Sequence, residues 1–227
     1  MMRSSISWIN IGVLLVTAHN VCAANLDKPS DVALPIATTA KDHEPSAIEM
    51  AMMRTYHGGL LFMQGDLEEA IREFREAIRQ SPDSPVPHNN LAMALYLQDH
   101  VSEAKAELLI AITLNPSYAM AWSHLGFVLF DHGDPAAAVE RWKVGVQLDP
   151  SMPSAWGGLA IGLLAMGYVD QAAHSYRQTL RLDSQYADVR YLHQVRRWSP
   201  RATTHAGFFL DLLKSEADAR RQHEFRM

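Results

Sequence analysis

The chain has 227 residues, of which 48% are hydrophobic, and it carries a formal net charge of −5. This length allows one or two domains, and the apolar fraction is ordinary for a globular protein. The modest negative charge, together with a sequence that contains no basic run and no base-reading motif, argues against nucleic acid as a partner.

Residues 1–23 have the composition of a secretory signal peptide. Arg3 precedes the apolar run 8–18, and Val21 and Ala23 stand three and one residues before a cleavage point after Ala23, as the pattern of a signal peptide requires. An uncleaved segment that tethers the protein to a membrane is the alternative, but a span needs about 20 mainly apolar residues, and this run is shorter. A lipid on Cys22 is less favoured, because Val21 is large for the position before a lipidated cysteine. We expect export, most simply to the bacterial periplasm, with membrane contact only through this segment if it stays uncleaved.

Cleavage would also remove Cys22, the only cysteine of the chain. The mature protein would then have no disulfide, no cysteine nucleophile and no thiolate metal site, so its stability must come from packing. Residues 24–45 follow, with three prolines, scattered polar residues and no helical period. This composition predicts a flexible linker.

The clearest helical pattern runs over 119–152. Apolar residues recur at spacings of three and four from Trp122 to Leu129, which predicts one helix. Gly133 breaks this helix, Pro135 is placed to open a second one, and Pro150 follows its end. Such a hairpin cannot bury both of its apolar faces alone, so it needs neighbours.

The same pattern recurs with a period of 34 residues over 51–84, 85–118, 119–152 and 153–186. This pattern resembles the tetratricopeptide repeat, which has at the same period an aromatic residue, Leu, a small and a large residue, then Ala, an aromatic residue and Pro. The resemblance implies an all-α fold, a right-handed solenoid of antiparallel helix pairs, with four repeats in a domain over 46–186. The residues at the repeat's structural positions are Gly58, Ala70, Phe74, Pro82, Leu91, Ala104, Pro116, Trp122, Gly126, Ala138, Trp142, Pro150, Trp156, Ala172 and Tyr176.

These positions have physical reasons. Small residues such as Gly126 and Ala138 are expected where the two helices of a hairpin meet, and large residues such as Trp142 fill the space between hairpins. Burying one large apolar side chain contributes roughly 1.5–3 kcal/mol, so these residues should build the stack. The first repeat departs from the pattern, because Arg54 and His57 replace an aromatic residue and Leu.

A fainter copy of the register continues over 187–227. Tyr191 belongs to an apolar stripe, the sequence Trp198-Ser199-Pro200 is interpreted as a break, and Ala206 falls at a repeat position. We predict a degenerate fifth repeat, a capping helix pair with a charged tail. Its apolar residues Phe208, Phe209 and Leu212 must either pack against the fourth repeat or form a second binding surface, and packing is favoured because apolar helix faces are usually buried.

In this family the first helix of each repeat lines a concave groove that binds a peptide or a helix of a partner protein, through places 2, 5, 9, 12 and 13 of the repeat. Methionine and aromatic side chains there suit adaptable apolar recognition, and an asparagine amide suits a peptide backbone. Carried onto this sequence, the predicted groove residues are Asn89, Met93, Tyr96, Leu97, Met120, Ser123, Phe127, Phe130 and Asp131.

A subgroup of the family grips an acidic peptide terminus with Lys and Arg in this groove. Asn90 matches one position of that clamp, but Thr55, Met120 and His124 stand where its basic residues would be. The resemblance therefore does not predict the tail of a cytosolic chaperone as the partner.

Catalysis is the other class of function to weigh. The Asp-His pairs at 99–100 and 131–132 lie near turns, yet they sit at different phases of the repeat, and the sequence has no HExxH motif, phosphate loop or nucleophile elbow. We predict no enzyme, no metal site and no cofactor. The expected function is that of an exported scaffold or assembly factor in a cell-envelope complex. The alternative is a co-chaperone for an exported enzyme, such as a c-type cytochrome, or for a polysaccharide export machine; a metal carrier or enzyme is least favoured.

Overall fold

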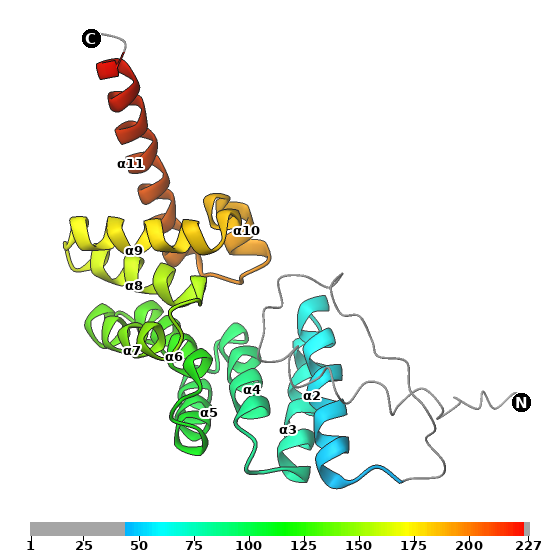
Figure 1. Ribbon diagram of the computed structural model, residues 1–227. Helices are drawn as coiled ribbons and strands as arrows, with labels where there is room; N and C mark the ends of the chain where they lie inside the picture. The colour runs from blue at the N-terminus through cyan, green and yellow to red at the C-terminus, as the bar shows by residue number, and fades with distance from the viewer. Residues whose placement is uncertain (1–43, 225–227) are drawn as a thin grey trace, which may run out of the picture. The chain divides into compact units, whose positions relative to one another are not determined.

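The computed structural model describes residues 44–224, and in this part of the chain the regular structure is entirely helical, as predicted (Figure 1). The predicted signal peptide and all but the last two residues of the predicted linker lie outside the described residues. The helices are α2 (Ala47–Gln64), α3 (Leu67–Gln80), α4 (Pro85–Leu97), α5 (Val101–Leu114), α6 (Ala119–Asp131), α7 (Pro135–Leu148), α8 (Pro153–Ala165), α9 (Val169–Leu182), the 3-10 helix η3 (Ser184–Ala187), α10 (Val189–Gln194) and α11 (Pro200–Glu224).

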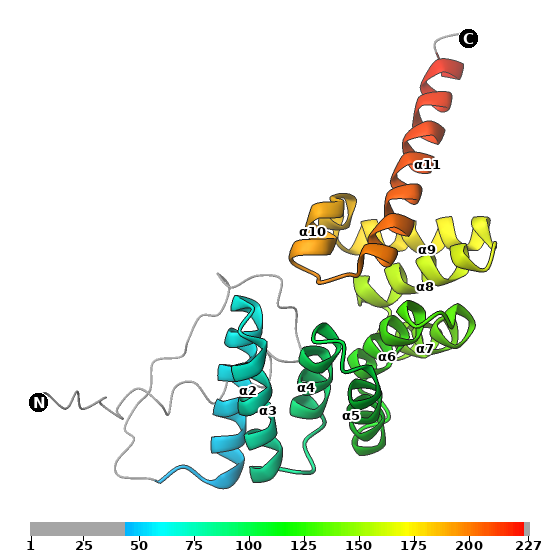
Figure 2. The same ribbon diagram turned by 180° about the vertical axis from the view of Figure 1, so that it is seen from behind.

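The chain divides into two compact units, one ending at Pro116 and the other beginning at Ser117. In the first unit α2 pairs with α3, α4 pairs with α5, and α3 packs against α4. In the second unit α6 pairs with α7, α8 pairs with α9, and α7 packs against α8. Each unit therefore contains two successive helical hairpins, and the view from behind shows the same pairs (Figure 2).

Local chemistry explains where the helices begin and end. Ser46 opens α2 with a capping box, in which its side chain accepts from Glu49 N–H and the Glu49 carboxylate accepts from Ser46 N–H. Gly65 then closes α2 at a φ of 92°, in the left-handed region that glycine adopts without steric cost. Asp99 occupies the corresponding turn of the second repeat at a φ of 65°, so that turn is locally strained.

The core of the second unit is built around Trp142 of α7, which is fully buried. Two glycines make room for its indole ring: a Cβ on Gly126 of α6 would lie 2.6 Å from Trp142 Nε1, and one on Gly158 of α8 would lie 2.3 Å from Cε2. The first unit repeats the arrangement, because a Cβ on Gly58 would lie 2.7 Å from Cε1 of the buried Phe74.

The other structural positions of the repeat fall into four groups. Ala70, Ala104, Ala138 and Ala172 are buried where the two helices of each hairpin meet. Trp122 and Trp156 are half-buried near the starts of α6 and α8. Leu91 and Tyr176 are buried, whereas Pro82, Pro116 and Pro150 are exposed in the turns between hairpins.

The C-terminal part departs from a regular hairpin. Its first helix, α10, has only six residues, and after it the chain reverses at Arg197, which has a φ of 57°. The N–H of Trp198 donates to the carbonyl of Leu192 at 3.0 Å, and α11 then packs against α8 and α10. Phe209 of α11 is buried and stacks on Tyr176 of α9, Leu212 is half-buried, and Phe208 stays exposed.

Candidate protein-interaction faces

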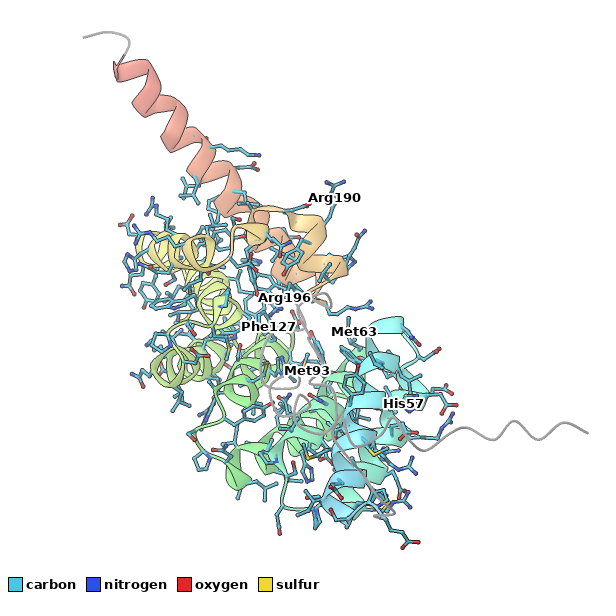
Figure 3. All side chains as sticks on the ribbon, turned by 45° about the vertical axis from the view of Figure 1, so that its right-hand side comes forward. His57, Met63, Met93, Phe127, Arg190 and Arg196 are labelled. Atoms are coloured by element: carbon cyan, nitrogen blue, oxygen red, sulfur yellow. The ribbon has the colours of Figure 1, made fainter. Side chains whose placement is uncertain are left out.

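The first helices of the hairpins carry two candidate faces, one in each unit, at the register places named above. We call the side of α2 and α4 that carries Met63, Met93, Tyr96 and Leu97 the first inner face. α2 and α4 contact each other, so these residues belong to neighbouring helices of one unit. Figure 3 labels Met63 and Met93.

The side chains of the first inner face are mainly apolar and partly accessible. Met63 is 41% exposed, and Met93, Tyr96 and Leu97 are half-buried. Asn89 differs from the expectation of an accessible amide: it is buried, and its Nδ2 donates to Oδ1 of Asn90 at 3.1 Å. Thioether and aromatic side chains together adapt to irregular apolar surfaces, so this face can hold an apolar segment of another protein.

The corresponding places of the second unit form the second inner face, on α6 and α8. Here the structure differs from the accessible groove that the sequence predicts, because Ser123, Phe127 and Phe130 are buried, while Met120 and Asp131 are half-buried. Residues 196–205, which we call the docked segment, cover this face. Burial of aromatic surface drives that contact.

The contacts of the docked segment are specific. Trp198 is only 4% exposed, and its ring centroid lies 5.1 Å from that of Phe127. The hydroxyl of Ser199 donates to Oδ1 of Asp131 at 2.6 Å. Further along, the guanidinium of Arg201 lies 4.7 Å from the centroid of the Phe130 ring. Figure 3 labels Phe127 on this face and Arg196 at the start of the docked segment.

The electrostatics of the same region favour a neutral histidine. Burial and, to a lesser extent, the positive charge of Arg196 lower the pKa of His124 to about 3. His124 therefore carries no charge near neutral pH. Arg196 itself lies over the ring of Tyr186, with its guanidinium carbon 5.6 Å from the ring centroid.

Two residues of this arrangement are absent from the sequence-based prediction. The sequence pattern places Trp198 in a break between helices and gives Gly157 no role. The signal that points to Gly157 is its register place, which carries Asn89 in the second repeat, Ser123 in the third and no side chain in the fourth. The signal that points to Trp198 is that a large aromatic residue stands beside the predicted break, while the fourth repeat has a glycine at this register place and therefore has room for a ring.

Three of the four residues in the Asp-His pairs considered as metal ligands have other partners. His100 lies 3.4 Å from Glu103, His132 Nδ1 lies 2.9 Å from the carbonyl of Val128, and Asp131 binds Ser199. Among the described residues, no three His, Cys, Asp or Glu side chains are grouped so that they could hold a metal ion. None of the described helices is long and apolar enough to cross a membrane.

Comparison with protein-family models gives two overlapping matches. The first model, described as TPR repeat, matches residues 58–99, and the second, described as Tetratricopeptide repeat, matches residues 89–153. Comparison with curated proteins gives no significant match.

Solved structures with the same arrangement of helices include MamA 41-end from Desulfovibrio magneticus RS-1. It is 19% identical over 73% of this chain and 96% of that chain, with a TM-score of 0.53, which is a likeness of fold. The first TPR domain of human RPAP3 is 26% identical over 53% of this chain and 95% of that one, with a TM-score of 0.50. The first TPR of Spaghetti (RPAP3), bound to the HSP90 peptide SRMEEVD, is 25% identical with the same coverage and TM-score.

Proposed function

We propose that this chain, which is a tetratricopeptide repeat protein and has the fold of a protein–protein interaction scaffold, binds a peptide or helix of a partner protein on its first inner face. The observation that carries the proposal is the partly accessible set of Met63, Met93, Tyr96 and Leu97 on two neighbouring helices. The peptide bound to the RPAP3 relative supports this class of ligand.

The chemistry of this face favours an apolar segment over an acidic tail. At the first clamp position, Thr55 is buried and its hydroxyl donates to the carbonyl of Ala51 at 2.7 Å, so it offers no charge to a carboxylate. Met120 and His124, which stand at further clamp positions, belong to α6 of the other unit and add no positive charge to this face. A partner helix or extended peptide with apolar side chains is the ligand that fits.

The test is affinity purification from the envelope fraction with the wild type and the triple variant Met63→Ser, Met93→Ser, Tyr96→Ser. Each change removes apolar contact area, so we expect the yield of a stoichiometric partner to fall at least about tenfold, which corresponds to about 1.4 kcal/mol of binding free energy. A matched control is Leu109→Ser, Ile110→Ser on α5, where the side chains are 53% and 41% exposed, and this variant should retain the partner.

Two results would contradict the proposal. One is equal recovery of the partner by the triple variant and by the α5 control. The other is a purified protein that retains metal and recovers no partner at all, which would favour a metal carrier or an enzyme.

We also propose that the protein acts after export to the bacterial periplasm, as a scaffold or assembly factor of an envelope complex. The composition of residues 1–23 supports this. Mass spectrometry of the purified mature protein is expected to find an N-terminus at Ala24. Detection of Met1 or Cys22 in that protein would instead favour an uncleaved membrane tether.

A narrower role within the same class is that of a co-chaperone for an exported enzyme, such as a c-type cytochrome, or for a polysaccharide export machine. The identity of the recovered partner separates these roles. A partner present only during assembly indicates a co-chaperone, whereas a partner in the mature complex indicates a scaffold.

A further inference from the structure

We infer that the second inner face is a binding site for a peptide in which serine directly follows a tryptophan and arginine stands three residues after that tryptophan. The chain's own docked segment has this sequence and fills the site. The inference goes beyond the proposed function, which concerns α2 and α4 only. A partner peptide with this chemistry would bind by displacing residues 196–205.

The centre of the site is a space shaped for the indole ring of Trp198. A Cβ on Gly157 of α8 would lie 2.7 Å from Cη2 and 3.1 Å from Cζ2 of Trp198, so only glycine at that position admits the ring. Phe127 and Tyr186 flank it, with ring centroids 5.1 Å and 5.8 Å from that of Trp198. Tryptophan has the largest aromatic surface to bury, so a smaller side chain would leave part of this space unfilled.

The residues after the tryptophan are recognised by polar and cationic contacts. Ser199 donates to Asp131 at 2.6 Å, and its hydroxyl also accepts from the N–H of Ala202 at 3.1 Å. Arg201 lies over Phe130, which is a cation–π contact. These contacts select a small hydroxyl directly after the tryptophan and an arginine three residues after it.

The docked segment behaves as an occupant of the face rather than as another hairpin of the stack. The helices α6 to α9 pack as successive pairs, whereas the docked segment, whose residues from Pro200 on form the first turns of α11, lies across the first helices of two repeats. Ser199 is bonded at the end of α6, and Trp198 lies against α8. The docked segment reaches this position through Arg197 in the left-handed region, a conformation that is strained for a non-glycine residue. That strain favours replacement by an equivalent segment from another molecule, which need not make the turn.

The probe is a fluorescently labelled synthetic peptide with the sequence of residues 194–205, titrated into the full-length protein and followed by fluorescence anisotropy. Wild type should bind it weakly, because the site is filled. The variant Trp198→Ala should bind it at least about tenfold more tightly, because its own segment has lost the anchoring ring. A peptide in which alanine replaces the tryptophan should bind neither protein.

A second substitution locates the binding on α8. Gly157→Ala in the Trp198→Ala protein should abolish binding of the peptide, because the added Cβ occupies the place of the ring. Alanine is favoured over glycine inside a helix, so this double variant should fold at least as well as Trp198→Ala. Retained binding by the double variant would overturn the site.

The remaining outcomes also decide the inference. If Trp198→Ala fails to fold by circular dichroism, the double variant Ser199→Ala, Arg201→Ala replaces it, and tighter peptide binding than to wild type is again expected. A folded variant that does not bind the peptide, or failure of both variants to fold, would show that residues 196–205 are a fixed part of the core. Neither result depends on whether α2 and α4 bind a partner, because these variants leave the first inner face unchanged.

Discussion

Replacement of Trp142 with alanine is expected to lower the free energy of unfolding of the second unit by about 3–5 kcal/mol. The ring is fully buried and lies against Gly126 and Gly158, so its removal leaves a cavity between three helices. Its Nε1 also donates to the backbone carbonyl of Ser123 at 3.0 Å, and the substitution removes that donor from a buried acceptor. Both effects act in the same direction.

Urea unfolding followed by far-UV circular dichroism measures this loss. Trp122→Ala is the matched control, because Trp122 is half-buried and its ring lies 5.6 Å from the guanidinium carbon of Arg141. Partial burial contributes less than the full value for a large apolar side chain, so the control should lose less than about 2 kcal/mol. Equal losses in the two variants would show that the space between hairpins is not filled by Trp142.

The repeat stack was predictable because its determinants are local and recur. A glycine and a tryptophan sixteen residues apart, Gly126 and Trp142, face each other across one hairpin, and the same spacing relates Gly58 to Phe74. A single pattern read four times thus predicts the helices and many of their buried residues. Turn chemistry adds the ends, since Gly65 and Gly133 both have positive φ.

The docked segment was not predictable in the same way, because no period connects it to its site. Ser199 and Asp131 are 68 residues apart in the chain, and their hydrogen bond depends on the length of α10 and on the turn at Arg197. The register identifies Phe127 and Phe130 as residues of the inner face. Whether that face meets solvent, a partner or the chain itself depends on this distant segment.

The last prediction concerns two adjacent phenylalanines of α11, for which the sequence left two outcomes open. Phe209→Ala is expected to lower the free energy of unfolding by about 3–5 kcal/mol, because the ring is fully buried. It stacks on Tyr176, with centroids 5.0 Å apart and planes at 19°. Phe208→Ala removes the same group from a side chain that is 50% exposed, so it should cost less than about 1 kcal/mol.

The comparison of these two variants isolates the contact that holds α11 on the fourth repeat. Both variants replace a phenylalanine of the same helix with alanine. A difference between their urea midpoints therefore reports which side of the helix is packed. The buried residues Ala202, Ala206 and Phe209 recur at spacings of four and three, which places one stripe of α11 against the core. Equal effects of the two substitutions would mean that α11 does not pack through this stripe, and the docked segment, which includes the first turns of α11, would then lose its second anchor.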